Sequence, residues 1–135
     1  VYPGMKELLW RFREQGGVIA VVSHSVSHYI LRDYRENGLP EPDAVYGWEL
    51  PPEQRKPEPW PLEQIMAKYG YDRSRMLDDL KPGFDMCERC GVDFAAAGWA
   101  NDIPEIERFM RRYGKYYFKT VADFGAFMEG TYEKR

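Results

Sequence analysis

The sequence has few cysteines, no long apolar run and no excess of basic charge, and each absence excludes a class of protein. Two cysteines, Cys87 and Cys90, are too few for a disulfide framework and fit a reducing cytoplasm. The longest purely aliphatic run, residues 18–22, is far too short to span a bilayer, and no signal-peptide pattern opens the chain. The formal net charge of -3 offers no basic surface to nucleic acid. We therefore expect a cytoplasmic protein with neither nucleic-acid nor membrane partners.

The composition that remains is that of a folded, soluble protein. Hydrophobic residues make up 44% of the chain and charged residues 30%, which is typical of a globular domain. A length of 135 residues suits one domain with a single core, so we predict one α/β domain over residues 1–135. The first residue is Val1 instead of an initiator methionine, and we expect the chain to be part of a longer protein.

Apolar runs of strand length alternate with segments that have helical spacing. The expected strands are residues 18–22, 43–48, 76–77, 92–97 and 116–120. The first of these runs is unbroken and rich in β-branched residues, which suits a parallel strand covered on both faces. Five prolines between residues 47 and 61 predict a stiff, irregular loop. The alternation predicts βα units in a Rossmann-like three-layer sandwich with a mostly parallel sheet.

Polar side chains follow two of the expected strands and one lies in the proline-rich loop. Ser23 directly follows residues 18–22, Asp78 and Asp79 follow residues 76–77, and Lys56 precedes a helix. Ligands of open parallel sheets bind beyond the carboxyl ends of the strands. There a hydroxyl and a helix N-terminus can bind a phosphate, a lysine can neutralise its charge, and two carboxylates can hold Mg²⁺. The pattern indicates a site for a phosphate and its magnesium ion.

Three short segments contain these residues in order: Val-Val-Ser ending at Ser23, Arg-Lys-Pro-Glu-Pro around Lys56, and Leu-Asp-Asp-Leu-Lys-Pro-Gly with Asp78 and Asp79. Together they resemble the second, third and fourth motifs of haloacid dehalogenase-like hydrolases, in particular the phosphoglycolate phosphatase-like branch. The resemblance implies that Ser23 and the His24 N–H bind the phosphoryl group and that Lys56 stabilises negative charge. It also implies that Asp79, together with Asp78, anchors Mg²⁺, and that the reaction is hydrolysis of a small phosphomonoester through an aspartyl-phosphate.

The family's first motif, Asp-x-Asp-Gly-Thr/Val, does not occur in the sequence. That motif supplies the aspartate nucleophile, so residues 1–135 alone are expected to be inactive. In this family its strand lies mid-sheet, between the strands that end at Ser23 and Asp78. We therefore expect the chain to be the second portion of the core, lacking that central strand, and to pair with a missing N-terminal segment or another chain. A non-catalytic domain that binds phosphate and Mg²⁺, or a regulatory one, stays open as the alternative.

The histidines and cysteines allow a second alternative, a metal or redox module. His24 and His28 are four residues apart, on one face of an expected helix, and Cys87 and Cys90 have the spacing of zinc ligands. However, both cysteines fall in a helical pattern whose apolar face they would join, which favours a buried packing role. His24 is expected to line the phosphate pocket and His28 to be structural.

Overall fold

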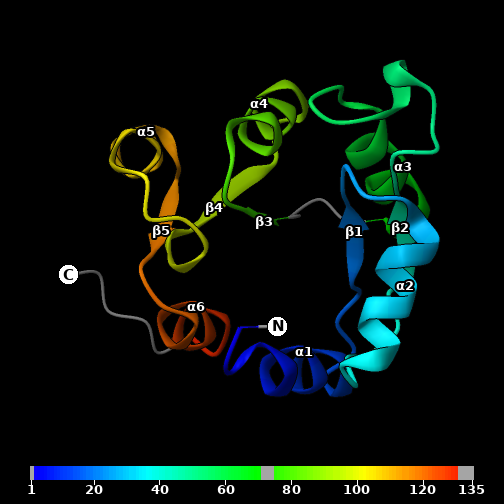
Figure 1. Cartoon of the computed structure of the whole chain (residues 1–135), viewed down its shortest axis with the longest axis horizontal. Coiled ribbons are helices and arrows are strands. Elements are labelled where there is room, and N and C mark those ends of the chain that lie inside the picture. The colour runs from blue at the N-terminus through cyan, green and yellow to red at the C-terminus, as the bar shows by residue number, and fades with distance from the viewer. Residues whose placement is uncertain (1, 71–74, 131–135) are drawn as a thin grey trace. The chain divides into compact units, whose positions relative to one another are not determined.

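The computed structural model describes residues 2–70 and 75–130, and the chain divides into two compact units between residues 72 and 73 (Figure 1). The described strands form a two-stranded parallel sheet in the first unit and a three-stranded parallel sheet in the second. Helices connect the strands in both units. The predicted class, α/β with parallel strands, is therefore confirmed, whereas a single domain over residues 1–135 stays a prediction. Over the described ranges every helix is too short or too polar to cross a bilayer.

The first unit contains, in chain order, α1 (Met5–Glu14), β1 (Ala20–Val22), α2 (Ser27–Glu36), β2 (Ala44–Tyr46), a short 3-10 turn η1 (Pro52–Gln54) and α3 (Trp60–Tyr69). Strands β1 and β2 pair in parallel with Val22 opposite Tyr46. Leu8, Ile30 and Leu62, one from each helix, are buried. The proline-rich segment between β2 and α3 is irregular apart from η1, as its sequence predicts.

Strand β1 is less buried than its sequence suggests. Its three residues are half-buried, whereas four of the five residues of β4 (Asp93–Ala97) are buried. Within the described chain β1 pairs with β2 alone, while β4 lies between two strands. A strand with a partner on each side gains cover that an edge strand lacks. Residues 20–22 are therefore only partly covered in the described part of the chain, whereas Ile19 next to them is buried.

The second unit contains β3 (Arg75–Asp78), α4 (Lys81–Cys90), β4, a 3-10 turn η2 (Gly98–Ala100), α5 (Pro104–Tyr113), β5 (Tyr116–Phe118) and α6 (Val121–Met128). The strand order is β3-β4-β5, with α4 packed on β3 and β4, and with α5 and α6 on β5 (Figure 1). Met86 and Phe118 are completely buried. The Phe84 ring lies edge-on to the rings of Phe94 and Phe109, with centroids 5.6 and 5.1 Å away.

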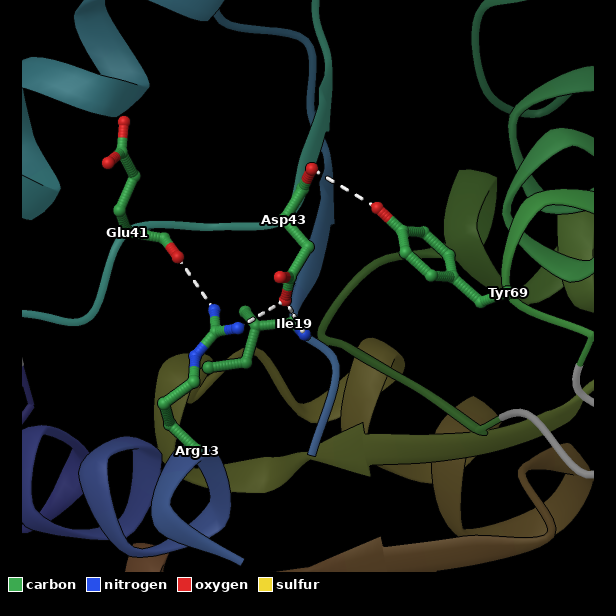
Figure 2. A network of polar contacts seen from close by, with 5 residues as sticks. All are labelled: Arg13, Ile19, Glu41, Asp43 and Tyr69. Atoms are coloured by element: carbon green, nitrogen blue, oxygen red, sulfur yellow. Dashed lines mark hydrogen bonds and ion pairs between the residues drawn. The ribbon is translucent and has the colours of Figure 1, made fainter. Parts of the chain in front are cut away.

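Asp43 holds the beginnings of β1 and β2 together in the first unit (Figure 2). Its carboxylate accepts hydrogen bonds from the Ile19 N–H at 2.8 Å and from the Arg13 guanidinium at 2.6 Å. The Asp43 N–H donates to the Ile19 carbonyl at 2.7 Å, and the Tyr69 hydroxyl donates to the Asp43 carbonyl at 3.2 Å. Arg13 also donates to the Glu41 carbonyl at 2.6 Å. One aspartate thus links the ends of α1 and α3 to both strands.

The hydrogen bond from Arg13 lowers the pKa of Asp43 below its ordinary value of 3.8, assisted by the backbone N–H of Ile19. The two side chains are 27% and 29% exposed, so solvent screens their attraction only in part. A carboxylate with a lowered native pKa stabilises the folded state when it is ionised. Asp43 therefore contributes stability above pH 3.8, and that contribution is lost as the pH falls through the lower native pKa.

We expect Asp43→Asn to lower the free energy of unfolding by about 1–2 kcal/mol, because charged hydrogen bonds are replaced by weaker or mismatched ones. Urea unfolding at neutral pH measures the loss. The difference from the unmodified chain should shrink as the pH falls below about 4. Asp33→Asn is the matched control, because the Asp33 carboxylate is 64% exposed and lies 3.7 Å from Arg32. A control as damaging as Asp43→Asn would contradict the role of the network.

Candidate functional site

Ser23 lies directly beyond β1, in the turn that leads to α2. Its N–H donates to the Tyr46 carbonyl at 3.0 Å, which extends the pairing of β1 with β2 by one residue. Its Oγ accepts a hydrogen bond from the Ser25 N–H at 3.0 Å. A serine hydroxyl that accepts one bond can still donate its proton to another oxygen. The turn therefore fixes Ser23 Oγ at the carboxyl end of the two strands while leaving it a donor for an anion.

His24 joins this turn to the loop that contains Lys56. The His24 Nε2 atom lies 3.1 Å from the Lys56 carbonyl oxygen. Because a carbonyl can only accept, Nε2 is the protonated nitrogen in this contact. The peptide bond between Lys56 and Pro57 is cis. Three residues predicted to bind phosphate, Ser23, His24 and Lys56, thus lie on two segments that are hydrogen-bonded to each other within the first unit.

The prediction that His24 and His28 share a helix face is wrong. Helix α2 begins at Ser27, so His28 is helical and His24 belongs to the preceding turn. The His28 ring packs against its neighbour Tyr29, with the ring centroids 4.2 Å apart. Val26 directly before the helix is extended, which ends the helical periodicity before it reaches His24.

Trp48 and Arg55 form an exposed stack next to His24. The Trp48 ring lies edge-on to the His24 ring with centroids 5.5 Å apart, and the Arg55 guanidinium carbon lies 3.6 Å from the centre of the indole. Arg55 also donates to the Trp48 carbonyl at 3.2 Å. The Trp48 N–H donates to the Ser25 carbonyl at 2.9 Å. The loop after β2 is therefore ordered around Trp48 and bonded to the turn after β1.

Glu49 is a site residue that the sequence analysis missed. Its Oε2 accepts a hydrogen bond from the Ser27 N–H, the first amide of α2, at 3.1 Å. Hydrogen bonding to Ser27 lowers the pKa of Glu49 below its ordinary value of 4.5. The predicted anion donor at the start of α2 is therefore already engaged by the protein's own carboxylate. The sequence signal was indirect: Val26, directly before the helix, has no side-chain acceptor to cap it.

Asp78 and Asp79 lie at the carboxyl end of β3, in the second unit. Asp78 is the last residue of β3 and is paired with Ala96 of β4. Its Oδ1 accepts a hydrogen bond from the Asp79 N–H at 2.8 Å. Its carboxylate also lies against Gly83 in the first turn of α4, where a Cβ would collide with it. The two residues predicted to hold Mg²⁺ are thus neighbours in the chain, and the Asp78 carboxylate is held against the beginning of a helix.

Asp79 lines a small, partly open pocket of the second unit. Asn101, Glu107, Met110 and Tyr117 contribute to its wall, together with residues 96–98. Glu107 is bonded to Arg111 at 2.9 Å, and the Arg111 guanidinium carbon lies 4.1 Å from the centre of the Tyr117 ring. Asp79 therefore lines a pocket whose wall also includes Glu107 and Asn101, and these two side chains are bonded to Arg111 and to the Ile103 N–H.

The described residues give no support to a zinc or redox centre. Among residues 2–70 and 75–130, no three or more histidine, cysteine, aspartate or glutamate side chains are grouped to hold a metal ion. Cys87 is 1% exposed in α4, and burial raises its pKa to about 12. A thiol with that pKa is almost fully protonated at neutral pH and is a poor nucleophile and ligand. The buried packing role predicted for Cys87 fits this environment.

The chain resembles known proteins both in sequence and in fold. Residues 1–97 match the family model described as haloacid dehalogenase-like hydrolase. A crystal structure of a phosphonoacetaldehyde hydrolase-like protein from Oleispira antarctica superposes with a TM-score of 0.76 at 15% sequence identity, over 96% of this chain and 56% of that one. The chain thus spans about half the length of that protein, and the similarity concerns the fold. No curated protein sequence matches.

We expect Gly83→Ala to destabilise the second unit by about 1–3 kcal/mol, because the added methyl group displaces the Asp78 carboxylate. A glycine-to-alanine change within a helix otherwise stabilises by about 1 kcal/mol. The matched test is the same change in an Asp78→Ala background. There the collision is absent, and Gly83→Ala should raise the free energy of unfolding. Urea unfolding of the unmodified chain, the two single variants and the double variant measures the coupling between Gly83 and Asp78. Stabilisation by Gly83→Ala with Asp78 present would contradict the packing described.

Cys87 should react with iodoacetamide at least about a hundredfold more slowly in the folded protein than in urea near pH 8, because its raised pKa suppresses the thiolate. Cys90, three residues further along α4 and half-buried, is the internal reference. Mass spectrometry of the two peptides over time gives both rates. Equal rates for the two thiols in the folded chain would show that Cys87 is accessible and reactive.

Proposed function

Because the chain belongs to the haloacid dehalogenase-like hydrolases, we propose that it supplies the phosphate- and Mg²⁺-binding part of an enzyme that hydrolyses small phosphomonoesters. In this proposal the aspartate nucleophile comes from outside residues 1–135, since no Asp-x-Asp sequence occurs within them. The nucleophile's carboxylate oxygen bonds to phosphorus, the alcohol leaves, and water then releases phosphate from the aspartyl-phosphate.

The observation that carries the proposal is the hydrogen bond between His24 and the Lys56 carbonyl. It joins two segments, 32 residues apart in sequence, that follow neighbouring parallel strands. This is the edge at which open parallel sheets bind ligands. The two segments predicted to bind phosphate are therefore hydrogen-bonded to each other beyond these strands, which supports the proposal.

Each residue of the first unit has a distinct task in the proposed reaction. Ser23 Oγ and the His24 N–H donate hydrogen bonds to phosphoryl oxygens, and the Lys56 ammonium stabilises the negative charge of the nucleophile and of the transferring group. Such groups act by positioning and by electrostatic stabilisation, which supply most of the catalysis in phosphoryl transfer. They hold the phosphoryl group but do not form a bond to phosphorus.

Asp78 and Asp79 are proposed to hold Mg²⁺ in the second unit. Their chemistry fits, because Mg²⁺ takes oxygen ligands and is commonly bound by one or two carboxylates, with waters and a substrate phosphate completing its shell. The Asp78 carboxylate accepts the Asp79 N–H, which fixes its orientation. When bound, the ion would neutralise phosphate charge. The two cysteines are too few for a disulfide framework, which is consistent with a reducing cytoplasm as the site of action.

One sequence feature favours a second candidate, a domain that binds phosphate and Mg²⁺ without catalysis. The absence of Asp-x-Asp from residues 1–135 removes the covalent step from these residues. The two proposals differ in whether the full protein contains an aspartate nucleophile. An Asp-x-Asp segment encoded upstream of Val1 supports the enzyme, and a protein without one supports the binding domain.

We expect Ser23→Ala and Lys56→Ala each to weaken the binding of inorganic phosphate by about tenfold, because each removes a hydrogen bond or charge to an anionic ligand. Titration of the chain followed by phosphorus NMR measures the affinity. Lys68→Ala, in the last turn of α3, is the matched control for a lost positive charge.

A separate titration of the chain with Mg²⁺ tests whether Asp78 and Asp79 bind the ion. Asp79→Asn should abolish most of the Mg²⁺ affinity, whereas Asp85→Asn should leave it unchanged, because Asp85 is paired with Lys81 at 3.1 Å on the surface of α4. Phosphate binding that is insensitive to Ser23 and Lys56, or Mg²⁺ binding that is insensitive to Asp79, would rule out the proposed site.

A further inference from the structure

Among the described residues, three hydrogen bonds join the loop after β2 to the segment that leads from β1 into α2. A carboxylate accepts one of them. Two involve the backbone of the loop, from Trp48 N–H to the Ser25 carbonyl and from His24 Nε2 to the Lys56 carbonyl. The third joins the Glu49 carboxylate to the Ser27 N–H. Removing the Glu49 side chain would therefore break one of these hydrogen bonds directly.

Helix α2 depends on Glu49 for a cap that its own sequence does not provide. Val26, directly before the helix, offers no side-chain acceptor, and the first turn of α2 contains no acidic residue. The first amides of a helix have no intrahelical partner and favour a negative charge nearby. Glu49 supplies both the acceptor and the charge from 22 residues away. The cap is therefore also a link between two loops.

Gly47 shows how closely these two loops approach each other. It is buried, and a Cβ built on it would lie 2.7 Å from the Ser25 carbonyl oxygen and 2.6 Å from Ser27 Oγ. Contacts of that length do not occur in folded proteins, so any other residue would separate the loops. The glycine permits the approach, and the neighbouring Glu49 carboxylate holds it.

The link continues from Glu49 to the groups of the proposed phosphate site. Glu49 follows Trp48, whose ring packs edge-on to the His24 ring, and His24 is bonded to the Lys56 carbonyl. Arg55, next to Lys56, covers the Trp48 indole at 3.6 Å. A shift of Glu49 therefore moves the contacts that place both His24 and Lys56.

We propose that Glu49 is a positioning residue that holds the segment carrying Lys56 against the turn carrying Ser23 and His24. This rests on the proposed function, in which those three residues bind a phosphoryl group. Glu49 does not touch the phosphoryl group in this role and acts through the backbone of α2. Its negative charge by itself would disfavour an anion nearby, so the proposal requires that the gain from ordering the loops exceeds that repulsion.

Two conservative substitutions separate the reach of the Glu49 side chain from its charge. Glu49→Asp keeps the charge but shortens the side chain by one methylene, so the bond to Ser27 is lost. Glu49→Gln keeps the length and an accepting oxygen but removes the charge. The same two substitutions at Glu53, an exposed residue of η1 in the same loop, are the matched controls.

Two readouts are measured for each variant. The first is the affinity for inorganic phosphate, and the second is the nuclear Overhauser effect between the His24 and Trp48 rings. We expect Glu49→Asp to weaken phosphate binding by about three- to tenfold, the range that corresponds to loss of a helix cap, and to reduce the ring contact. Glu49→Gln should preserve both, and the Glu53 variants should change neither.

Other outcomes overturn the inference. If Glu49→Gln tightens phosphate binding and Glu49→Asp leaves it unchanged, Glu49 acts only as a repelling charge. If both variants lower the thermal midpoint but leave phosphate affinity and the ring contact intact, Glu49 is only a helix cap. If the unmodified chain does not bind phosphate, the proposed function fails. The contact between the His24 and Trp48 rings then tests the inference by itself, and its persistence in Glu49→Asp would refute a positioning role for Glu49.

Discussion

Within each unit, the pairing of parallel strands is the constraint on which the candidate binding residues depend, because it brings the carboxyl ends of neighbouring strands to one edge. In the first unit Val22 lies opposite Tyr46, and the Ser23 N–H continues the pairing to the Tyr46 carbonyl. The turn after β1 and the loop after β2 therefore begin side by side. Further along, the bond between His24 and the Lys56 carbonyl joins these two segments. At the other end of the same strands, the Asp43 carboxylate secures the register by binding the Ile19 N–H and Arg13.

The same constraint places the acidic pair in the second unit. Asp78 is paired with Ala96, so Asp79 begins its loop next to the end of β4, and it lines a pocket with residues 96–98. The buried centre of this unit, around Met86 and Phe118, fixes α4 and β5 on the sheet. Asp78 is then held between its own strand and Gly83 of α4. Packing against α4 thus determines the direction of the Asp78 carboxylate, and the register of β3 with β4 determines the location of Asp79.

The sequence predicted the elements and the edge at which polar residues gather, because hydrophobic periodicity and the position of a residue after a strand are local properties. It could not predict contacts that depend on tertiary structure. Glu49 caps a helix that begins 22 residues earlier, and a carboxylate in a proline-rich loop has no local pattern that indicates this partner. The four-residue spacing of the histidines predicts a shared helical face, whereas the extended Val26 excludes His24 from the helix. The half-buried state of β1 depends on its neighbours, which its own residues do not specify.

Both units place one of the protein's own carboxylates against the beginning of a helix, Glu49 at α2 and Asp78 at α4. A helix N-terminus favours negative charge, and a phosphate is the ligand usually expected there. Here the first amide of α2 is already bonded, so a phosphate at the proposed site would rely on Ser23, the His24 N–H and Lys56. Repulsion between two anions several ångströms apart costs about 1 kcal/mol in a solvated loop, which a single lysine can offset. A carboxylate next to these residues is therefore compatible with anion binding, provided that it orders the loops that provide the binding groups.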